Sequence, residues 1–210
     1  PAGIGKTSLA LAAVRAETAE HVVARASAGA RGASLTAIVQ LLEALGVDMT
    51  AETEHAALVA AALRSLDVRR SPLLLVVDDA PRLYPSSVTV LHHVVRHDRL
   101  RTVLTARDGE ALPDPLDHLL DEGAATSMSV PPLALDDCGD VLCAALGVVD
   151  TGAVARLHDA SGGNPLILRE LVAGTAAADG FVATSAGWSL AEPVPSSRLV
   201  DLVTRRFETL

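Results

Sequence analysis

PAGIGKTS, at residues 1–8, is the stretch that most constrains the fold of this chain. Gly5, Lys6 and Thr7 match the second half of the phosphate-binding pattern G-x-x-x-x-G-K-[ST], whose first glycine would stand immediately before Pro1. The sequence therefore predicts a truncated segment that begins inside the motif and lacks the strand that precedes it. A glycine-rich turn ahead of an ordinary helix is the alternative, and motifs further along the chain decide between the two.

If this stretch binds phosphate, its residues have distinct tasks. Gly3 and Gly5 leave room for backbone turns that point N–H groups at phosphate oxygens. Lys6 brings a positive charge to the β- and γ-phosphates, and Thr7 brings a hydroxyl to Mg²⁺. A helix expected at Ser8–Ala16 turns its positive N-terminus toward the same phosphates. The predicted nucleotide-binding residues in this stretch are Gly3, Ile4, Gly5, Lys6, Thr7 and Ser8.

Composition narrows the classes of function. Half of the 210 residues are hydrophobic, which is enough for a sizeable aliphatic core, and the net charge is −9. Only 2% of residues are aromatic, so stacking platforms for single-stranded nucleic acid are not expected. An acidic chain without a basic stripe is a poor candidate for binding DNA through its own surface. The apolar run Leu73–Val77, like every other apolar run in the sequence, is far too short to span a membrane.

Neither the cysteines nor the histidines form a metal motif. Cys138 and Cys143 stand five residues apart without zinc-ligand spacing, so reduced thiols on a helix and a cytoplasmic location are expected. His92, His93 and His97 share one predicted helix, but the glutamate of H-E-x-x-H is missing. A solvated or partly buried helix face therefore explains these histidines better than a bound metal.

The first part of the chain alternates apolar strands with helices, which is typical of an α/β parallel sheet. The predicted strands are His21–Ala26, Pro72–Val77, Arg101–Ala106 and Ala125–Val130. The predicted helices after Ser8–Ala16 are Ser34–Leu45, Glu54–Leu66, Ser86–His97 and Asp114–Asp121. Gly46 is expected to end the second of these five helices, because glycine adopts the left-handed conformation of a helix C-cap.

Pro131 and Pro132 mark a change of character, after which the pattern is mostly helical. We expect a core domain at 1–131 and a helical lid subdomain at 132–210. The helices predicted in the lid are Asp136–Leu146, with Asp136 as its N-cap, then Val154–Ala160, Pro165–Ala173 and Ser197–Thr209. A small hairpin around Gly187 is predicted at Phe181–Ala191.

A second motif, LLLVVDD at Leu73–Asp79, places two carboxylates where a buried strand ends. Ligands of α/β sheets collect at this edge, and the pattern resembles a Walker B element. Asp78 is expected to hold Mg²⁺ through water, and Asp79 to orient or deprotonate an attacking water. The alternative is a pair of aspartates that caps a loop. Arg107, which follows the next strand, either contacts the γ-phosphate or its water, or is a solvated loop residue.

Four motifs in this order resemble the NTPase module of large LuxR-type transcriptional regulators, which are AAA+-like signalling ATPases of the STAND class. These motifs are PAGIGKTSL, LLLVVDDA, VLTARDGE and SGGNPLILREL. The resemblance covers essentially the whole chain and implies strand order 5-1-4-3-2, with strand 1 missing by truncation. It implies that Asn164 and Pro165 lie near the nucleotide and couple its state to the lid. The residues alone favour the alternative, a helix N-terminus that Gly163, Asn164 and Pro165 merely cap. One departure is Ala80-Pro81-Arg82-Leu83, where the family commonly has Ala-His.

The resemblance implies an ATP-binding regulatory switch that uses ATP and Mg²⁺ and hydrolyses ATP slowly. DNA would be bound only by a helix-turn-helix outside this segment; self-association is left open, and no membrane partner is expected. A non-hydrolysing nucleotide-binding or oligomerisation scaffold is the main alternative. A replication-initiator or clamp-loader-like ATPase that acts on DNA is a third, and the acidic balance counts against it.

Overall fold

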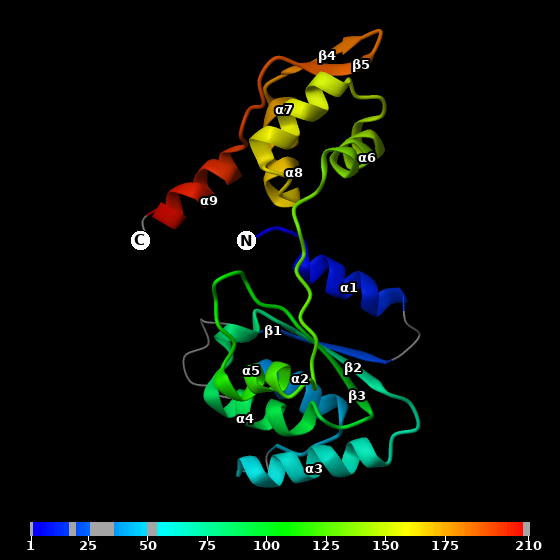
Figure 1. Ribbon diagram of the computed structural model, residues 1–210, viewed down its shortest axis with the longest axis vertical. Coiled ribbons are helices and arrows are strands. Elements are labelled where there is room, and N and C mark those ends of the chain that lie inside the picture. The colour runs from blue at the N-terminus through cyan, green and yellow to red at the C-terminus, as the bar shows by residue number, and fades with distance from the viewer. Residues whose placement is uncertain (1, 17–19, 26–35, 50–53, 208–210) are drawn as a thin grey trace. The chain divides into compact units, whose positions relative to one another are not determined.

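The computed structural model describes residues 2–16, 20–25, 36–49 and 54–207, shown as coloured ribbon in Figure 1. The chain forms two compact units. One consists of Lys6–Met128, which we call the sheet unit. The other consists of Pro1–Gly5 together with Ser129–Leu210, which we call the helical unit.

The sheet unit is built on three parallel strands in the order β1-β2-β3. The strands are β1 (His21–Arg25), β2 (Leu73–Asp78) and β3 (Leu100–Leu104). In the register, Val76 of β2 lies opposite Val23 of β1 and Val103 of β3. The predicted parallel α/β arrangement is confirmed, as is the pairing of the strand that carries the two aspartates with the strand that precedes Arg107.

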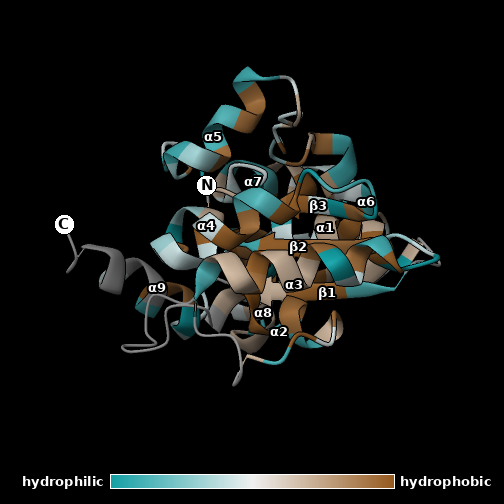
Figure 2. Ribbon diagram, turned by 90° about the horizontal axis from the view of Figure 1, so that it is seen from below, coloured by the Kyte–Doolittle hydropathy of each residue, from teal (hydrophilic) through white to brown (hydrophobic). Residues whose placement is uncertain are grey.

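The central strand β2 is apolar on both faces because helices cover both. Leu73, Leu75 and Val77 belong to a core cluster with residues of α2, α3, α4 and α5, whereas Leu74 and Val76 pack with α1. Successive side chains of a strand point to opposite faces, so the continuous run from Leu73 to Val77 fills two layers. Figure 2 shows β2 coloured as hydrophobic along its length.

The helices of the sheet unit lie where the periodicity predicts them, with shifts of at most three residues at their ends. They are α1 (Lys6–Ala16), α2 (Thr36–Ala44), α3 (His55–Asp67), α4 (Pro85–Val94) and α5 (Asp114–Asp121), with a 3₁₀ turn at Ala80–Arg82. Gly46 ends α2 as predicted: its φ is +69°, and the Val47 N–H donates to Leu42 O at 2.9 Å. The predicted residues Ala26, Ser34 and Leu35 lie outside the described residues.

The helical unit contains four helices and a hairpin among its described residues. These are α6 (Leu135–Leu146), α7 (Thr151–Ser161), α8 (Pro165–Ala177), β4 (Phe181–Thr184), β5 (Gly187–Leu190) and α9 (Ser197–Phe207). The antiparallel pairing of β4 with β5 confirms the predicted hairpin. Its separate core is formed by Cys138, Leu142, Val149, Ala153, Val154, Leu157, Leu168, Leu171 and Leu190.

Two sequence predictions are wrong. Residues 125–130 form no strand and pair with no described strand; 125–129 are exposed, and Met128 is 76% exposed. Of these six residues only Met128 and Val130 are large and apolar, so a strand there would bury little. Asp136 is not the N-cap of α6, because the helix begins one residue earlier with Ala134 as N-cap. The Ala134 N–H donates to Asp137 Oδ2 at 3.4 Å, so a carboxylate in the first turn supplies the capping bond.

Candidate functional site

Thr7 and Asp78 meet at the carboxyl end of the central strand. Asp78 is the last residue of β2, and Thr7 lies in the first turn of α1, which packs on the face formed by Leu74 and Val76. The Thr7 hydroxyl donates to Asp78 Oδ1 at 2.6 Å across 71 positions of sequence. The fold therefore brings together the two residues predicted to hold Mg²⁺.

Thr105 completes this arrangement; it belongs to the motif VLTARDGE, but the sequence predicts no role for it. It follows β3 directly, and its hydroxyl donates to the same Asp78 Oδ1 at 2.7 Å. The same hydroxyl accepts the Asp79 N–H at 3.1 Å. The sequence feature that could have identified Thr105 is its place as a polar residue directly after the apolar end of β3, the strand next to β2. Parallel neighbouring strands place such residues at one edge of the sheet.

Asp79 adopts a left-handed backbone conformation, with φ 59° and ψ 45°. Aspartate tolerates this region better than most residues, yet it remains unusual for any residue with a Cβ. The turn directs the chain from β2 into the 3₁₀ turn at Ala80–Arg82, whose N-cap is Asp79. Asp79 is thereby set apart from Asp78, and the two carboxylates have different partners.

Asp79 is one of four charged side chains that form a cluster. Arg107 Nη2 donates to Asp79 Oδ2 at 3.0 Å, and Arg82 Nε lies 4.0 Å from the same oxygen. Both arginines also approach Glu110 Oε1, each at 3.8 Å. These side chains are between 29% and 40% exposed, so each pair contributes on the order of 1 kcal/mol or less to stability. These contacts matter more for chemistry than for stability, because the Arg107 guanidinium already binds the Asp79 carboxylate, which is expected to orient or deprotonate water.

Residues 2–5 belong to the helical unit, where they contact the start of α8. The Asn164 side-chain amide donates to Ala2 O at 2.9 Å, and the Leu166 N–H faces Gly3 O at 3.3 Å. Asn164 Oδ1 also accepts the Leu166 N–H at 3.0 Å as the N-cap of α8, and Pro165 takes the first helical position. The motif GNPL therefore contacts the first residues of the glycine-rich stretch directly.

The remaining predicted residues of this stretch differ in exposure. Ile4 is buried, Gly5 and Lys6 are partly buried, and Ser8 is exposed. Gly3 and Gly5 have φ values of +79° and +100°, which residues with a Cβ rarely adopt. Glycine is therefore required at both positions for the observed backbone.

The donor set fits a magnesium–nucleotide complex. Mg²⁺ prefers oxygen ligands and is usually held by one or two carboxylates together with substrate phosphates. Thr7 and Asp78 offer a hydroxyl and a carboxylate, and among the described residues no group of three or more His, Cys, Asp or Glu side chains is placed to hold a metal alone. His92 and His93 lie in the last turn of α4, and His97 follows this helix. Burial, followed by the nearby Arg96 guanidinium, lowers the pKa of His92.

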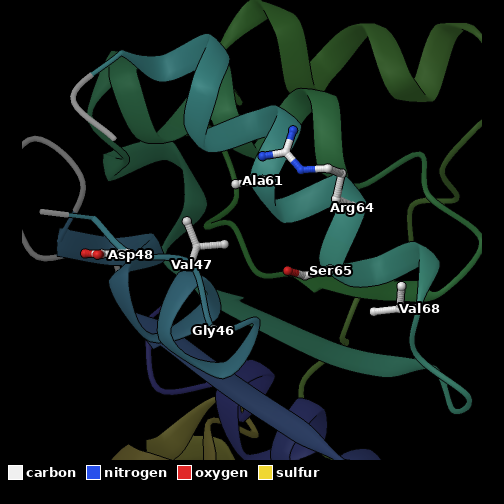
Figure 3. Close-up of a pocket in the computed structure, with 7 residues that line it drawn as sticks. All are labelled: Gly46, Val47, Asp48, Ala61, Arg64, Ser65 and Val68. Atoms are coloured by element: carbon white, nitrogen blue, oxygen red, sulfur yellow. The ribbon is translucent and has the colours of Figure 1, made fainter. Parts of the chain in front are cut away.

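A surface hollow of about 260 Å³ lies elsewhere on the sheet unit (Figure 3). Its lining residues come from the segment that follows α2, and from the second half of α3 with its C-cap residue: Gly46, Val47, Asp48, Ala61, Arg64, Ser65 and Val68. Because α3 leads into the start of β2, this hollow lies toward the amino ends of the strands, whereas Asp78 and Thr105 lie at the carboxyl ends. It is not part of the site described above. None of the described helices is long and apolar enough to cross a membrane.

The fold is similar to two solved structures. One is the Aeropyrum pernix ORC2 protein in its ADPNP–ADP complexes, with a TM-score of 0.56 and 16% identity over 99% of this chain and 59% of that chain. The other is the Thermotoga maritima RuvB Holliday junction branch migration motor, with a TM-score of 0.50 and 15% identity over 100% of this chain and 59% of that chain. This chain thus spans about 59% of the length of each. No protein-family model and no curated protein matches it. The likeness shows the fold alone, a parallel α/β sheet flanked by helices.

Proposed function

We propose that this chain is the ATP-binding regulatory NTPase module of a LuxR-type transcriptional regulator. The observation that carries nucleotide binding is the 2.6 Å hydrogen bond between Thr7 and Asp78. It joins the G-K-T and L-L-L-V-V-D-D motifs at the carboxyl edge of a parallel sheet, where α/β proteins bind their ligands. The regulatory assignment rests on the order of the four sequence motifs.

Each residue of the site has a task in this proposal. The backbone N–H groups of the glycine-rich stretch and the positive end of α1 attract phosphate, and Lys6 adds a full charge. Thr7 and Asp78 would hold Mg²⁺, which neutralises phosphate charge when it is bound. Asp79 would orient or deprotonate water, and Arg107 would contact the γ-phosphate. Asn164 and Pro165 would couple the glycine-rich stretch to the lid, a role supported by the Asn164–Ala2 hydrogen bond.

The arrangement around Asp79 supports slow hydrolysis. Its carboxylate accepts a hydrogen bond from Arg107 and lies 4.0 Å from Arg82. Before this carboxylate could engage a water molecule, its hydrogen bond with the Arg107 guanidinium would have to be released or shared. A long-lived nucleotide-bound state suits a switch, whose output would pass to a DNA-binding domain outside this segment. A cytoplasmic location belongs to the same proposal.

Replacing Lys6 by alanine in the full-length protein tests nucleotide binding. We expect calorimetry to show at least about a tenfold loss of ATP affinity, since charge-assisted contacts to phosphate contribute about 1.5–3 kcal/mol each. Arg15→Ala is the matched control, because it removes a cation from the other end of the same helix. ATP affinity that is unchanged in Lys6→Ala, or absent in the wild type, would contradict the proposal.

The same Arg107–Asp79 contact also favours a second candidate, a module that binds nucleotide without hydrolysing it. Asp79→Asn separates the two candidates, because asparagine tolerates the left-handed conformation and removes only the charge. Wild-type turnover that disappears in Asp79→Asn supports a slow ATPase. Absence of turnover in both proteins, with ATP binding intact, supports the non-hydrolysing module.

A further inference from the structure

Thr105 forms hydrogen bonds along the whole segment from Val77 to Ala80, which carries both aspartates. It is 7% exposed, and its backbone N–H donates to Val77 O at 2.9 Å. Its carbonyl oxygen accepts the Ala80 N–H at 2.9 Å. Its hydroxyl donates to Asp78 and accepts the N–H of Asp79. One residue of a neighbouring strand end therefore bonds to four consecutive residues, from Val77 to Ala80.

The direction of the two hydroxyl bonds is fixed by chemistry. A backbone N–H can only donate, so the Thr105 oxygen accepts from Asp79. Its single hydrogen is then free to go to Asp78 Oδ1, which as a carboxylate oxygen can only accept. Successive hydrogen bonds of this kind polarise one another, and the bond to a charged acceptor is the stronger type.

The bond to the Asp79 N–H has a second effect. Asp79 has a positive φ, which costs about 1–2 kcal/mol for a residue with a Cβ. Such a conformation persists only when neighbouring contacts determine it. The hydroxyl of Thr105 and the Ala80–Thr105 backbone bond supply these contacts on either side of the Asp79 carbonyl. The direction in which the Asp79 side chain leaves the sheet therefore depends on Thr105.

We propose that Thr105 is a positioning residue that sets the orientation of both Asp78 and Asp79. The inference rests on the proposed function in so far as it assigns Asp78 to Mg²⁺. Thr7 and Thr105 both donate to Asp78 Oδ1. If Thr7 turns to a metal ion, the Thr105 hydroxyl continues to fix the carboxylate. Groups that orient a metal ligand in this way typically change metal affinity by about 10–100-fold when they are removed.

The strand offers an internal control for this role. Thr102 lies in β3 opposite Leu75, and its hydroxyl is buried without a hydrogen-bond partner among the described residues. Thr102→Val and Thr105→Val make the same chemical change three positions apart. Only the second removes a hydroxyl that bonds to the aspartates. Thr105→Ser keeps the hydroxyl and loses the methyl group.

The test measures two quantities in the full-length protein. The first is Mn²⁺ affinity at saturating ADP, by electron paramagnetic resonance. The second is amide hydrogen exchange at Asp79 without nucleotide, by NMR. In Thr105→Val we expect at least about tenfold weaker Mn²⁺ binding and faster exchange at Asp79. We expect Thr105→Ser and Thr102→Val to stay within about twofold of the wild type.

Each outcome decides one claim. Wild-type Mn²⁺ affinity and Asp79 protection in Thr105→Val would overturn the positioning role. An Asp79 amide that exchanges in the wild type as fast as in an unstructured peptide would overturn it without any variant, even if Thr105→Val fails to fold. If the wild type binds no Mn²⁺–ADP, the proposed function fails. The exchange comparison between Thr105→Val and Thr105→Ser then still decides whether Thr105 holds the turn.

Discussion

A methyl group added at Gly174 is expected to destabilise the helical unit, although alanine forms helices better than glycine. Gly174 is buried in α8, against the segment that leads into α9. A Cβ there would meet the backbone oxygen of Val194 and lie 2.5 Å from Ser196 N and 2.6 Å from Pro195 C. All three are backbone atoms, so no side-chain rotation relieves the overlap. Residues 194–196 would have to move away from α8.

The magnitude follows from the hydrogen bonds that this movement breaks. The Val194 N–H donates to Thr175 Oγ1 at 2.9 Å, and the Ser196 hydroxyl donates to Glu170 Oε2 at 2.8 Å. Thr175 is 0% exposed and Glu170 is 5% exposed. A buried acceptor left without its donor costs about 1–3 kcal/mol, so two cost roughly 2–6 kcal/mol. Alanine recovers about 1 kcal/mol of helix propensity. The net loss of unfolding free energy is therefore about 1–5 kcal/mol.

Gly139→Ala is the matched control and is expected to have the opposite sign. Gly139 lies inside α6 of the same unit, and the nearest atom to an added Cβ is Val154 Cγ1 at 3.6 Å, an ordinary contact. The substitution should stabilise the unit by up to about 1 kcal/mol. Urea unfolding can be followed by the fluorescence of Trp188, the one tryptophan of the chain, which lies in β5 of this unit. Equal stability of the two variants, or the reverse order, would refute the reasoning.

Thr102→Val should leave the sheet unit as stable as the wild type or raise its unfolding free energy by up to about 1 kcal/mol, because the Thr102 hydroxyl is buried without a partner among the described residues. A clear loss in urea unfolding followed by circular dichroism would contradict this. Glu170→Gln should cost stability at pH 7, and the cost should shrink below pH 4.5. Hydrogen bonds from Arg169 and then from Ser196 lower the pKa of Glu170 from 4.5. Their contribution to the free energy of unfolding is therefore complete above pH 4.5 and is lost as the pH falls through the lowered pKa. If the difference in unfolding free energy between the wild type and Glu170→Gln does not change with pH, this explanation is wrong. Gly3→Ala should destabilise the helical unit more than Gly5→Ala does, as measured without nucleotide by tryptophan fluorescence. Both positions have positive φ, at about 1–2 kcal/mol each, but only at Gly3 would the new Cβ overlap the first turn of α8. Equal losses would refute the overlap.

The sheet was predictable where one strand alone reveals its surroundings. Leu73–Val77 is apolar at every position, which predicts a strand covered on both faces, and all five residues are buried. The prediction of a strand at 125–130 is wrong, because a local sequence pattern does not show whether a neighbouring strand is there to pair with. Those residues permit a strand, but their small and polar side chains give it little to bury, and the chain stays irregular there.

The motifs of the site were predictable from the sequence, but the additional contacts that β3 and the segment after it make with the two aspartates were not. The glycine-rich stretch and the aspartate pair predict that Thr7 and Asp78 lie together, and the structure places them 2.6 Å apart. The left-handed turn at Asp79 was not predictable, because bonds from another strand stabilise it. Arg107 was expected either at a phosphate or in solvent, and its guanidinium contacts Asp79. Such pairings depend on the register of β2 with β3, which a single sequence does not display.

The exposed stretch around Met128 has a consequence for any cut made there. A single proteolytic cut after Met128 would leave residues 2–5 covalently attached to the fragment that carries the sheet. Their hydrogen bonds, however, run from Asn164 and Leu166 on the other fragment. The two fragments would therefore retain a short complementary segment, and mixing them should allow reassociation. A nicked chain of this kind would behave as a two-piece protein with its own dissociation constant.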